Sequence, residues 1–203
     1  CYVFSLPQMC SMAELFATKI WQYDITSKVE DTDLAALSRT VLDNVQGDDA
    51  RRSNFGKSYR TGDNFLPGPL HKHKVGLEVA KCYRGAVADY GYSPNKLAFI
   101  YWGIATHNGG YNIRHCHPGC LLSGVLYLSA PKGSGVLRLT DPRPAKRFES
   151  VSFREADHPL HGDFLVTPKE GLLVIFPAWL EHEVEPSVGI DTPRIIMSFN
   201  AVL

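Results

Sequence analysis

The sequence lacks a net charge, a basic run and any long apolar segment. Its 21 Lys and Arg residues balance its 21 Asp and Glu residues. Without basic residues clustered or interleaved with aromatic ones, we expect neither nucleic acid nor an anionic membrane surface as a partner. No apolar run approaches the roughly 20 residues of a membrane-spanning helix, and no signal peptide is apparent. These absences favour a soluble protein, which we expect in the cytoplasm.

A regular cysteine framework is also missing. The five cysteines are an odd number at irregular spacing, and no CxxC pair occurs. This pattern does not indicate a disulfide scaffold and favours a reducing compartment. Cys116 lies between two histidines and Cys120 follows them, but the two cysteines do not have the spacing of a zinc site. We interpret the cysteines as structural.

The length fits a single domain spanning residues 1–203, because a chain of this size can bury a sizeable core. We expect a tail over residues 1–13, followed by a strand and supporting helices over residues 14–96. Apolar residues at helical spacing predict helices over Thr32–Val45, capped by Asp31–Asp33, and over about Leu70–Tyr90. The composition of Phe16–Ile25 indicates a strand. Between the two helices, Gln46–Pro69 is rich in turn-forming residues and predicts a long surface loop.

From Leu97 onward, short apolar runs alternate with turn signals. The predicted strands are Leu97–Thr106, Asn112–His117, Leu121–Ser129, Val136–Thr140, Phe164–Thr167, Leu172–Phe176, Glu181–Glu185 and Arg194–Val202. About eight short strands after two helices predict an α+β, mainly β domain, in which a β-sandwich or barrel is braced by the helices.

The candidate site begins with His115 and His117, which are separated by one residue on a predicted strand. Alternate residues of a strand share a face, so both imidazoles can reach one metal ion. An HxH pair alone is a weak signal, because histidine occupies 8 of the 203 positions. His182 follows a strand that ends in a proline bend, and it is the candidate for a third ligand. Neutral imidazoles are common ligands of divalent transition metals.

Arg194 opens an otherwise apolar strand, where an inward-facing arginine is costly unless it meets an anion. Either an internal salt bridge or a ligand carboxylate would satisfy it. Ser198 lies four residues later on the same face and could add a hydroxyl donor. Tyr127, inside another apolar strand, needs a hydrogen-bond partner if it is buried.

The series His115-x-His117, His182 and Arg194, with its flanking segments SGVLYL, GLLVIFPAWLEHEVEP and RIIMSFN, resembles the 2-oxoglutarate/Fe(II)-dependent oxygenases in a subgroup close to the prolyl hydroxylases. The resemblance implies a double-stranded β-helix (jelly roll) over residues 97–203 with the N-terminal helices packed outside. It implies Fe(II), 2-oxoglutarate and O₂ as metal and cosubstrates, with Arg194 and Tyr127 holding the distal carboxylate of 2-oxoglutarate. It also implies hydroxylation of an unactivated C–H bond of an amino-acid residue or small molecule, so that the partner is a small molecule or peptide.

The chain departs from the commonest pattern of these enzymes in its ligand set. His117 stands where they usually carry Asp or Glu, so three neutral ligands leave the iron with one more positive charge. Asp141, in LRLTDPR, is the best alternative source of a carboxylate ligand. The catalytic metal site predicted from the sequence is therefore His115, His117 and His182.

Two other classes of function fit parts of the pattern. The first is the cupins, whose second sequence motif is nearly reproduced here from Gly171 to His182, with Trp179 replacing a glycine. Three-His iron dioxygenases of that class need no 2-oxoglutarate. The third possibility is a non-catalytic β-helix that binds a ligand without redox chemistry. Formation of succinate and CO₂ from 2-oxoglutarate separates the three.

Overall fold

The computed structural model describes residues 16–45, 54–143 and 163–202. In chain order its elements are β1 (Trp21–Asp24), α1 (Asp31–Asn44), β2 (Asn54–Phe55), β3 (Ser58–Arg60), a 3₁₀ turn (Leu70–Lys72), α2 (Lys74–Asp89), a second 3₁₀ turn (Pro94–Lys96), β4 (Ala98–Thr106), β5 (Tyr111–His115), β6 (Leu122–Ser129), β7 (Leu137–Leu139), β8 (Phe164–Val166), β9 (Leu172–Pro177), β10 (His182–Val184) and β11 (Arg194–Val202).

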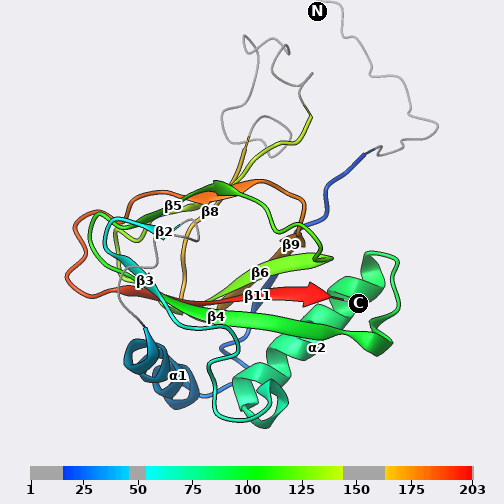
Figure 1. Cartoon of the computed structure of the whole chain (residues 1–203), viewed down its shortest axis with the longest axis horizontal. Coiled ribbons are helices and arrows are strands. Elements are labelled where there is room, and N and C mark those ends of the chain that lie inside the picture. Colours follow the sequence, from blue (N-terminus) through cyan, green and yellow to red (C-terminus); the bar gives the residue numbers. More distant parts are fainter. Residues whose placement is uncertain (1–15, 46–53, 144–162, 203) are drawn as a thin grey trace, which may run out of the picture.

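The strands form two antiparallel sheets that face each other. The larger sheet has the order β1-β9-β6-β11-β4-β3, and the smaller has the order β2-β5-β10-β7-β8. In Figure 1 the sheets form two layers, and α1 and α2 lie outside the larger sheet, below β4 and β11. This arrangement is the mainly β, double-stranded β-helix fold predicted from the sequence.

The predicted helices and the strands after residue 97 are present, with ends shifted by a few residues. The N-terminal cap of α1 is Glu30, one residue before the predicted Asp31–Asp33, and Asp31 and Asp33 form the predicted acidic first turn. The Glu30 backbone N–H donates to Asp33 Oδ2 at 3.2 Å. The loop prediction for Gln46–Pro69 is wrong in part, because the short strands β2 and β3 form there and pair with β5 and β4, respectively. The predicted tail and residues 46–53 lie outside the described residues. Both sheets also contain strands from before residue 97: β1 and β3 join the larger sheet, and β2 joins the smaller one.

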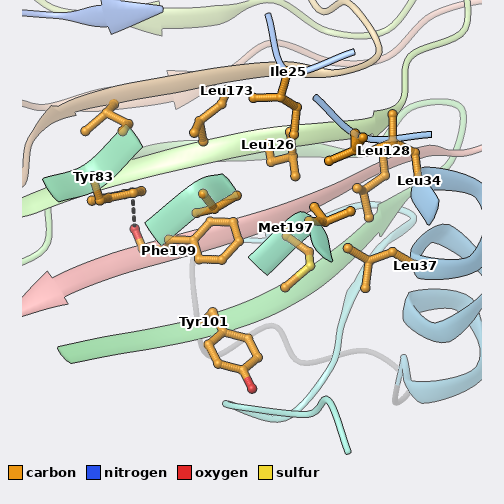
Figure 2. Packing of buried hydrophobic residues seen from close by; sticks show 14 of the residues in the cluster. Ile25, Leu34, Leu37, Tyr83, Tyr101, Leu126, Leu128, Leu173, Met197 and Phe199 are labelled. Atoms are coloured by element: carbon orange, nitrogen blue, oxygen red, sulfur yellow. Dashed lines mark hydrogen bonds between the residues drawn. The ribbon is translucent and has the colours of Figure 1, made fainter. Parts of the chain in front are cut away.

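Alternation along the larger sheet divides its residues between two interiors. On β11 the odd-numbered residues face the helices and belong to a core with α1 and α2, of which Met197 and Phe199 are fully buried members. Figure 2 shows Phe199 beneath Tyr83 of α2, whose hydroxyl donates to the Phe199 carbonyl at 3.2 Å. The even-numbered residues, such as Ile196, face the opposite sheet and a second apolar cluster. One strand therefore supplies both the core and the wall of an inner cavity.

Two glycines on the helix-facing side let the helices approach the sheet. A Cβ at Gly103 would lie 2.7 Å from the methyl groups of Val41 on α1. A Cβ at Gly124 would lie 2.4 Å from the backbone oxygen of Val174 and 2.5 Å from the hydroxyl of Tyr83 on α2. Since real Cβ atoms do not make contacts this short, each position has room only for glycine at the present helix-to-sheet distance.

The three cysteines that the structure describes, Cys82, Cys116 and Cys120, are free thiols. No helix within the described residues is long and apolar enough to cross a membrane.

Replacing Gly124 with Ala should destabilise the protein by about 1–3 kcal/mol, because the added methyl forces α2 or the neighbouring strand to move. Gly62→Ala is the matched control, since a Cβ at Gly62 meets nothing within 4 Å. Urea unfolding of the two variants measures the difference. Equal stabilities would show that the sheet and α2 can separate at this point without cost.

Candidate functional site

A cavity of about 570 Å³ lies between the two sheets. Its wall on the larger sheet consists of cavity-facing residues of β4, β6 and β11, and its opposite wall consists of residues from β5, β7 and β10. The histidines and Arg194 predicted from the sequence all line it, together with Tyr127 and Ser198. The fold thus brings together residues that are spread over 84 positions of the chain, from 115 to 198.

Within the described residues, His115, His117 and His182 form the group able to hold a metal ion. Their potential ligand nitrogens all lie within 4.8 Å of one another. His115 ends β5 and pairs with His182, which begins β10. A bulge follows this pair, because three steps on β5 match two on β10, so Asn112 and His115 both face the cavity.

His117 is placed differently from the sequence prediction. The strand ends at His115, and His117 lies in the following turn rather than on a strand shared with it. Its backbone N–H donates to the Ala178 carbonyl at 2.8 Å, which ties the turn to the end of β9. Simple alternation therefore does not bring the two imidazoles together; the turn after β5 does.

Hydrogen bonds at Nδ1 fix which ring nitrogen each histidine presents to an ion. His115 Nδ1–H donates to the Ile113 carbonyl at 2.7 Å, and His182 Nδ1–H donates to the Leu180 carbonyl at 2.9 Å. A carbonyl can only accept, so both rings carry their proton on Nδ1 and leave Nε2 as a lone-pair ligand. The hydrogen bonds of the two rings thus leave Nε2 unprotonated, as binding to a metal requires.

The third ring, that of His117, has a side-chain partner that can either donate or accept a hydrogen bond. His117 Nδ1 lies 3.3 Å from the amide of Asn200, which in turn receives the hydroxyl of Ser123 at 2.5 Å. Because an amide offers both a donor and an acceptor, Asn200 can turn its oxygen to a protonated Nδ1, and Ser123 can then accept. His117 Nε2 is then available as a ligand.

Burial keeps the three imidazoles neutral. Desolvation, with smaller contributions from His115 and Arg60, lowers the pKa of His117 to about 4. Desolvation, with His115 as the next cause, lowers the pKa of His182 to about 3. The pKa of His115 is also lowered, mainly by desolvation. Neutral imidazole is the form that binds a metal, so the cluster is ready for an ion without losing protons first.

The metal-capable group contains no carboxylate. Asp141, the alternative ligand suggested by the sequence, directs its carboxylate to Arg143, whose Nε and Nη2 donate at 2.9 and 2.7 Å. It is not among the residues that line the cavity. Within the described residues, the site therefore offers three neutral ligands to a cation.

Arg194 is the most deeply buried charged side chain of the cavity, with 1% of its surface exposed. Its guanidinium donates to the Gly135 carbonyl at 3.1 Å and to Thr106 Oγ1 at 3.2 Å, and its Nε is buried without a partner. No carboxylate within the described residues forms an ion pair with it. Of the two ways to satisfy Arg194, an internal salt bridge is absent from the described residues, and a ligand carboxylate fits.

Tyr127 and Ser198 line the cavity on the same sheet as Arg194. Tyr127 is fully buried and pairs with Ile196 of β11, two residues from Arg194. Desolvation raises the pKa of Tyr127 to about 12, and the nearby charge of Arg194 opposes that shift. Ser198 is half-buried and lines the cavity. Both residues thus share the cavity with the guanidinium.

Several polar residues of the cavity were not predicted from the sequence. Asn54 and Asn112 are hydrogen-bonded to each other and buried, with one amide donor and one acceptor left unpartnered. Thr106 joins Arg194 to Ser58 through a hydroxyl pair at 3.0 Å. Such residues have no distinctive spacing in the sequence, and their roles appear only once β2, β3 and β4 are paired.

A double-stranded β-helix with converging histidines beside a buried arginine defines a class of protein, the mononuclear metal oxygenases of the jelly-roll type. The sequence comparison narrows it: residues 100–200, about half of the chain, match the family described as "Putative 2OG-Fe(II) oxygenase". The chain belongs to this 2-oxoglutarate/Fe(II) oxygenase family. The resemblance found in the sequence is therefore confirmed, and no curated protein sequence matches the chain.

Solved structures share the fold at low sequence identity. A prolyl-4-hydroxylase from Pseudomonas putida has 18% identity and a TM-score of 0.61, covering 92% of this chain and 94% of its own. The epimerase SnoN from nogalamycin biosynthesis has 13% identity and a TM-score of 0.62, covering 91% and 76%. HygX from Streptomyces hygroscopicus, with nickel and 2-oxoglutarate bound, has 12% identity and a TM-score of 0.57, covering 91% and 83%.

Family membership decides between the three classes of function considered for the sequence. The protein is a 2-oxoglutarate/Fe(II)-dependent oxygenase, with Fe(II), 2-oxoglutarate and O₂ as metal and cosubstrates. Family membership therefore argues against a cupin dioxygenase that needs no 2-oxoglutarate and against a non-catalytic β-helix.

The lowered pKa values predict how acid affects the metal-free protein. Each buried histidine has a lower pKa in the folded state than the value of about 6.5 expected when unfolded, so its stabilising contribution is present above pH 6.5. As the pH falls from about 6.5 toward 3, the unfolded state binds protons first, and the free energy of unfolding should fall.

Urea unfolding of the metal-free protein at a series of pH values measures this effect. His182→Gln should flatten the profile, because it removes the histidine with the lowest pKa of the three. The exposed His71 provides the matched control, and His71→Gln should keep the wild-type profile. A profile for His182→Gln as steep as that of the wild type would contradict the prediction.

Proposed function

We propose that the protein hydroxylates an unactivated C–H bond of an amino-acid residue or small molecule. One oxygen atom of O₂ enters the substrate and the other enters succinate, as 2-oxoglutarate loses CO₂. In this proposal His115, His117 and His182 hold Fe(II), and Arg194 binds the distal carboxylate of 2-oxoglutarate with help from Tyr127 and Ser198. Family membership supports the oxygenase chemistry.

The observation that carries the proposal is the buried guanidinium of Arg194. A charge with 1% exposure, neutral protein partners and an unpartnered Nε is unfavourable unless an anion joins it. A carboxylate accepts two parallel N–H bonds from an arginine, which matches the planar geometry of both groups. Tyr127 and Ser198 offer hydroxyl donors to the same carboxylate.

The chain contributes position and electrostatics to the reaction. When bound, Fe(II) supplies the centre at which 2-oxoglutarate and O₂ are activated. The bonds of His115 and His182 to backbone carbonyls keep their Nε2 atoms directed to one point and unprotonated. The apolar wall residues Ile104, Leu137 and Val184 reduce the water around that point, and a dry pocket strengthens the attraction between Arg194 and its anion.

The substrate belongs to one of two groups. The likeness to a prolyl-4-hydroxylase supports an amino-acid residue in a peptide. The likeness to HygX, whose structure has also been solved with hygromycin B, supports a small molecule. Succinate production stimulated by candidate substrates, measured across amino acids and peptides, tests the first group. No stimulation by any amino acid or peptide would remove the prolyl-hydroxylase-like version.

Replacing His182 with Ala should abolish stoichiometric iron binding and turnover, since two remaining imidazoles are a poor site for Fe(II). Metal content after anaerobic loading measures the first effect, and circular dichroism checks the fold. His117→Ala tests the ligand that replaces the usual carboxylate. If His117→Ala kept full iron affinity and activity, His117 would not be a ligand, and Asp141 would be the next residue to replace.

Replacing Arg194 with Ala should weaken 2-oxoglutarate binding by roughly 30- to 3000-fold, because loss of one partner of a buried charge pair costs about 2–5 kcal/mol. Iron affinity should hardly change, since no proposed ligand is lost. Arg194→Lys should recover part of the loss, because an ammonium keeps the charge without the planar fork. An anaerobic titration of 2-oxoglutarate against Fe(II)-loaded protein measures the affinities. Equal affinities for wild type and Arg194→Ala would place the cosubstrate elsewhere.

A further inference from the structure

One of the three histidines of the metal-capable group differs from the other two in its hydrogen-bond partner. Nδ1 of His115 and Nδ1 of His182 each face a backbone carbonyl, which only accepts, so each ring carries its proton on Nδ1. Nδ1 of His117 instead lies 3.3 Å from the side-chain amide of Asn200. An amide has a donor at one end and an acceptor at the other, so this hydrogen bond can run in either direction.

Asn200 is held in the cavity wall by a second side chain. It lies on β11 directly opposite Ser123 of β6, and both residues line the cavity. Both are buried, with 7% of Asn200 and 2% of Ser123 exposed. The Ser123 hydroxyl donates to Asn200 Oδ1 at 2.5 Å. Ser123, Asn200 and His117 therefore form a chain of two hydrogen bonds, which we call the relay.

In the structure the relay runs toward the imidazole. The Ser123 hydroxyl donates to the amide oxygen of Asn200, and the amide nitrogen donates to His117 Nδ1. Because Nδ1 accepts a hydrogen bond in this direction, a neutral His117 carries its proton on Nε2. Nε2 is the nitrogen that remains for a metal ion, and a protonated Nε2 cannot bind one. Ligation by His117 therefore requires the opposite direction.

The same groups are also satisfied when the relay runs the other way. If the Asn200 amide turns over, its oxygen accepts the proton of His117 Nδ1 and its nitrogen donates to the Ser123 hydroxyl. The hydroxyl proton can then turn to the Phe199 carbonyl, which lies 3.5 Å from Ser123 Oγ. The rotation exchanges an oxygen and a nitrogen of similar size, so it needs no movement of the backbone. The relay thus has two complete arrangements.

We propose that Asn200 is a positioning residue for His117, and that the relay reverses when His117 binds the metal ion. The proton of the neutral ring moves from Nε2 to Nδ1 by exchange with water, and Nε2 then offers its lone pair to the ion. Ligation by His117 therefore releases no net proton and leaves each group of the relay with a partner. This inference rests on the proposed function, because it takes His117 as a ligand of Fe(II).

A purely structural role for the relay makes a different prediction. Asn200 and Ser123 would then only satisfy each other between β11 and β6, and the contact with His117 would not affect the metal. Loss of the Asn200 amide would lower the stability of the protein without changing the metal affinity of the folded molecules. The proton of His117 would also stay on the same nitrogen with and without metal.

NMR spectroscopy of histidine rings labelled with ¹⁵N measures directly which nitrogen carries the proton. The probe is Zn(II), a diamagnetic ion that imidazole binds, and the pH is about 8, above the ordinary pKa of imidazole. The signal that disappears in His117→Gln identifies the ring. In the wild type we expect the His117 proton on Nε2 without metal and on Nδ1 with Zn(II). His115 and His182 should carry theirs on Nδ1 in both samples.

Substitutions of Asn200 test the relay through metal affinity, measured by calorimetry. Asn200→Leu, which has a similar size and no polar group, should weaken Zn(II) binding by roughly 10- to 100-fold, the usual effect of losing the partner of a ligating histidine. Asn200→Asp should bind Zn(II) at least as tightly as the wild type. Its His117 should carry the proton on Nδ1 even without metal, because a carboxylate only accepts. Asn44, exposed at the end of α1, gives the matched controls Asn44→Leu and Asn44→Asp, which should change neither property.

Two outcomes would overturn the proposal: the same protonated nitrogen of His117 with and without Zn(II) in the wild type, or a wild-type affinity in Asn200→Leu. If Asn200→Leu does not fold, Asn200→Asp decides, because a His117 proton on Nε2 in that variant would contradict the relay. Failure of the proposed ligand set gives a different result. If His117→Gln binds Zn(II) as tightly as the wild type, His117 is not a ligand, and that part of the proposed function fails together with this inference.

Discussion

The structure depends on the pairing of β11 with both β4 and β6. This strand is hydrogen-bonded along its length on both sides, so neighbouring residues must point alternately to the helices and to the cavity. Apolar residues on one side attach α1 and α2, and the residues on the other side include Arg194 at one end and Asn200 at the other. A shift of one residue in this pairing would move the arginine into the helix-facing core and Phe199 into the cavity. The stability of the fold and the geometry of the site are thus set by one register.

Much of this could be predicted from the sequence, because the relevant signals are local. Helical spacing found α1 and α2, and the short apolar runs found the strands after residue 97. The histidines and Arg194 stood out because each is a polar residue at the edge of an apolar run. The family resemblance then supplied the β-helix, Fe(II) and 2-oxoglutarate.

What the sequence did not reveal depends on contacts between distant segments. Strands β2 and β3 have two and three residues, too short for a periodic signal, and they gain their order from pairing with β5 and β4. The position of His117 depends on the turn after β5 and on a bond to Ala178, neither of which alternation predicts. Arg60 looked like one of many charged residues in a loop until its burial against Trp102 was known.

The two short connections between the sheets near Arg194 have a mechanical consequence for the cavity. β2 and β3 belong to different sheets, and so do β4 and β5, so the short turns at Gly56–Lys57 and at residues 107–110 both cross from one sheet to the other. The turns are in contact: a Cβ on Gly56 would lie 2.8 Å from the Gly109 oxygen, and His107 N–H donates to the Lys57 carbonyl at 2.8 Å. At this end the sheets are held at a fixed separation by covalent links rather than by side-chain packing alone. The width of the pocket around the guanidinium of Arg194 is therefore set by the length of these two turns. Changes in the distant apolar core alter the stability of the protein before they alter that width.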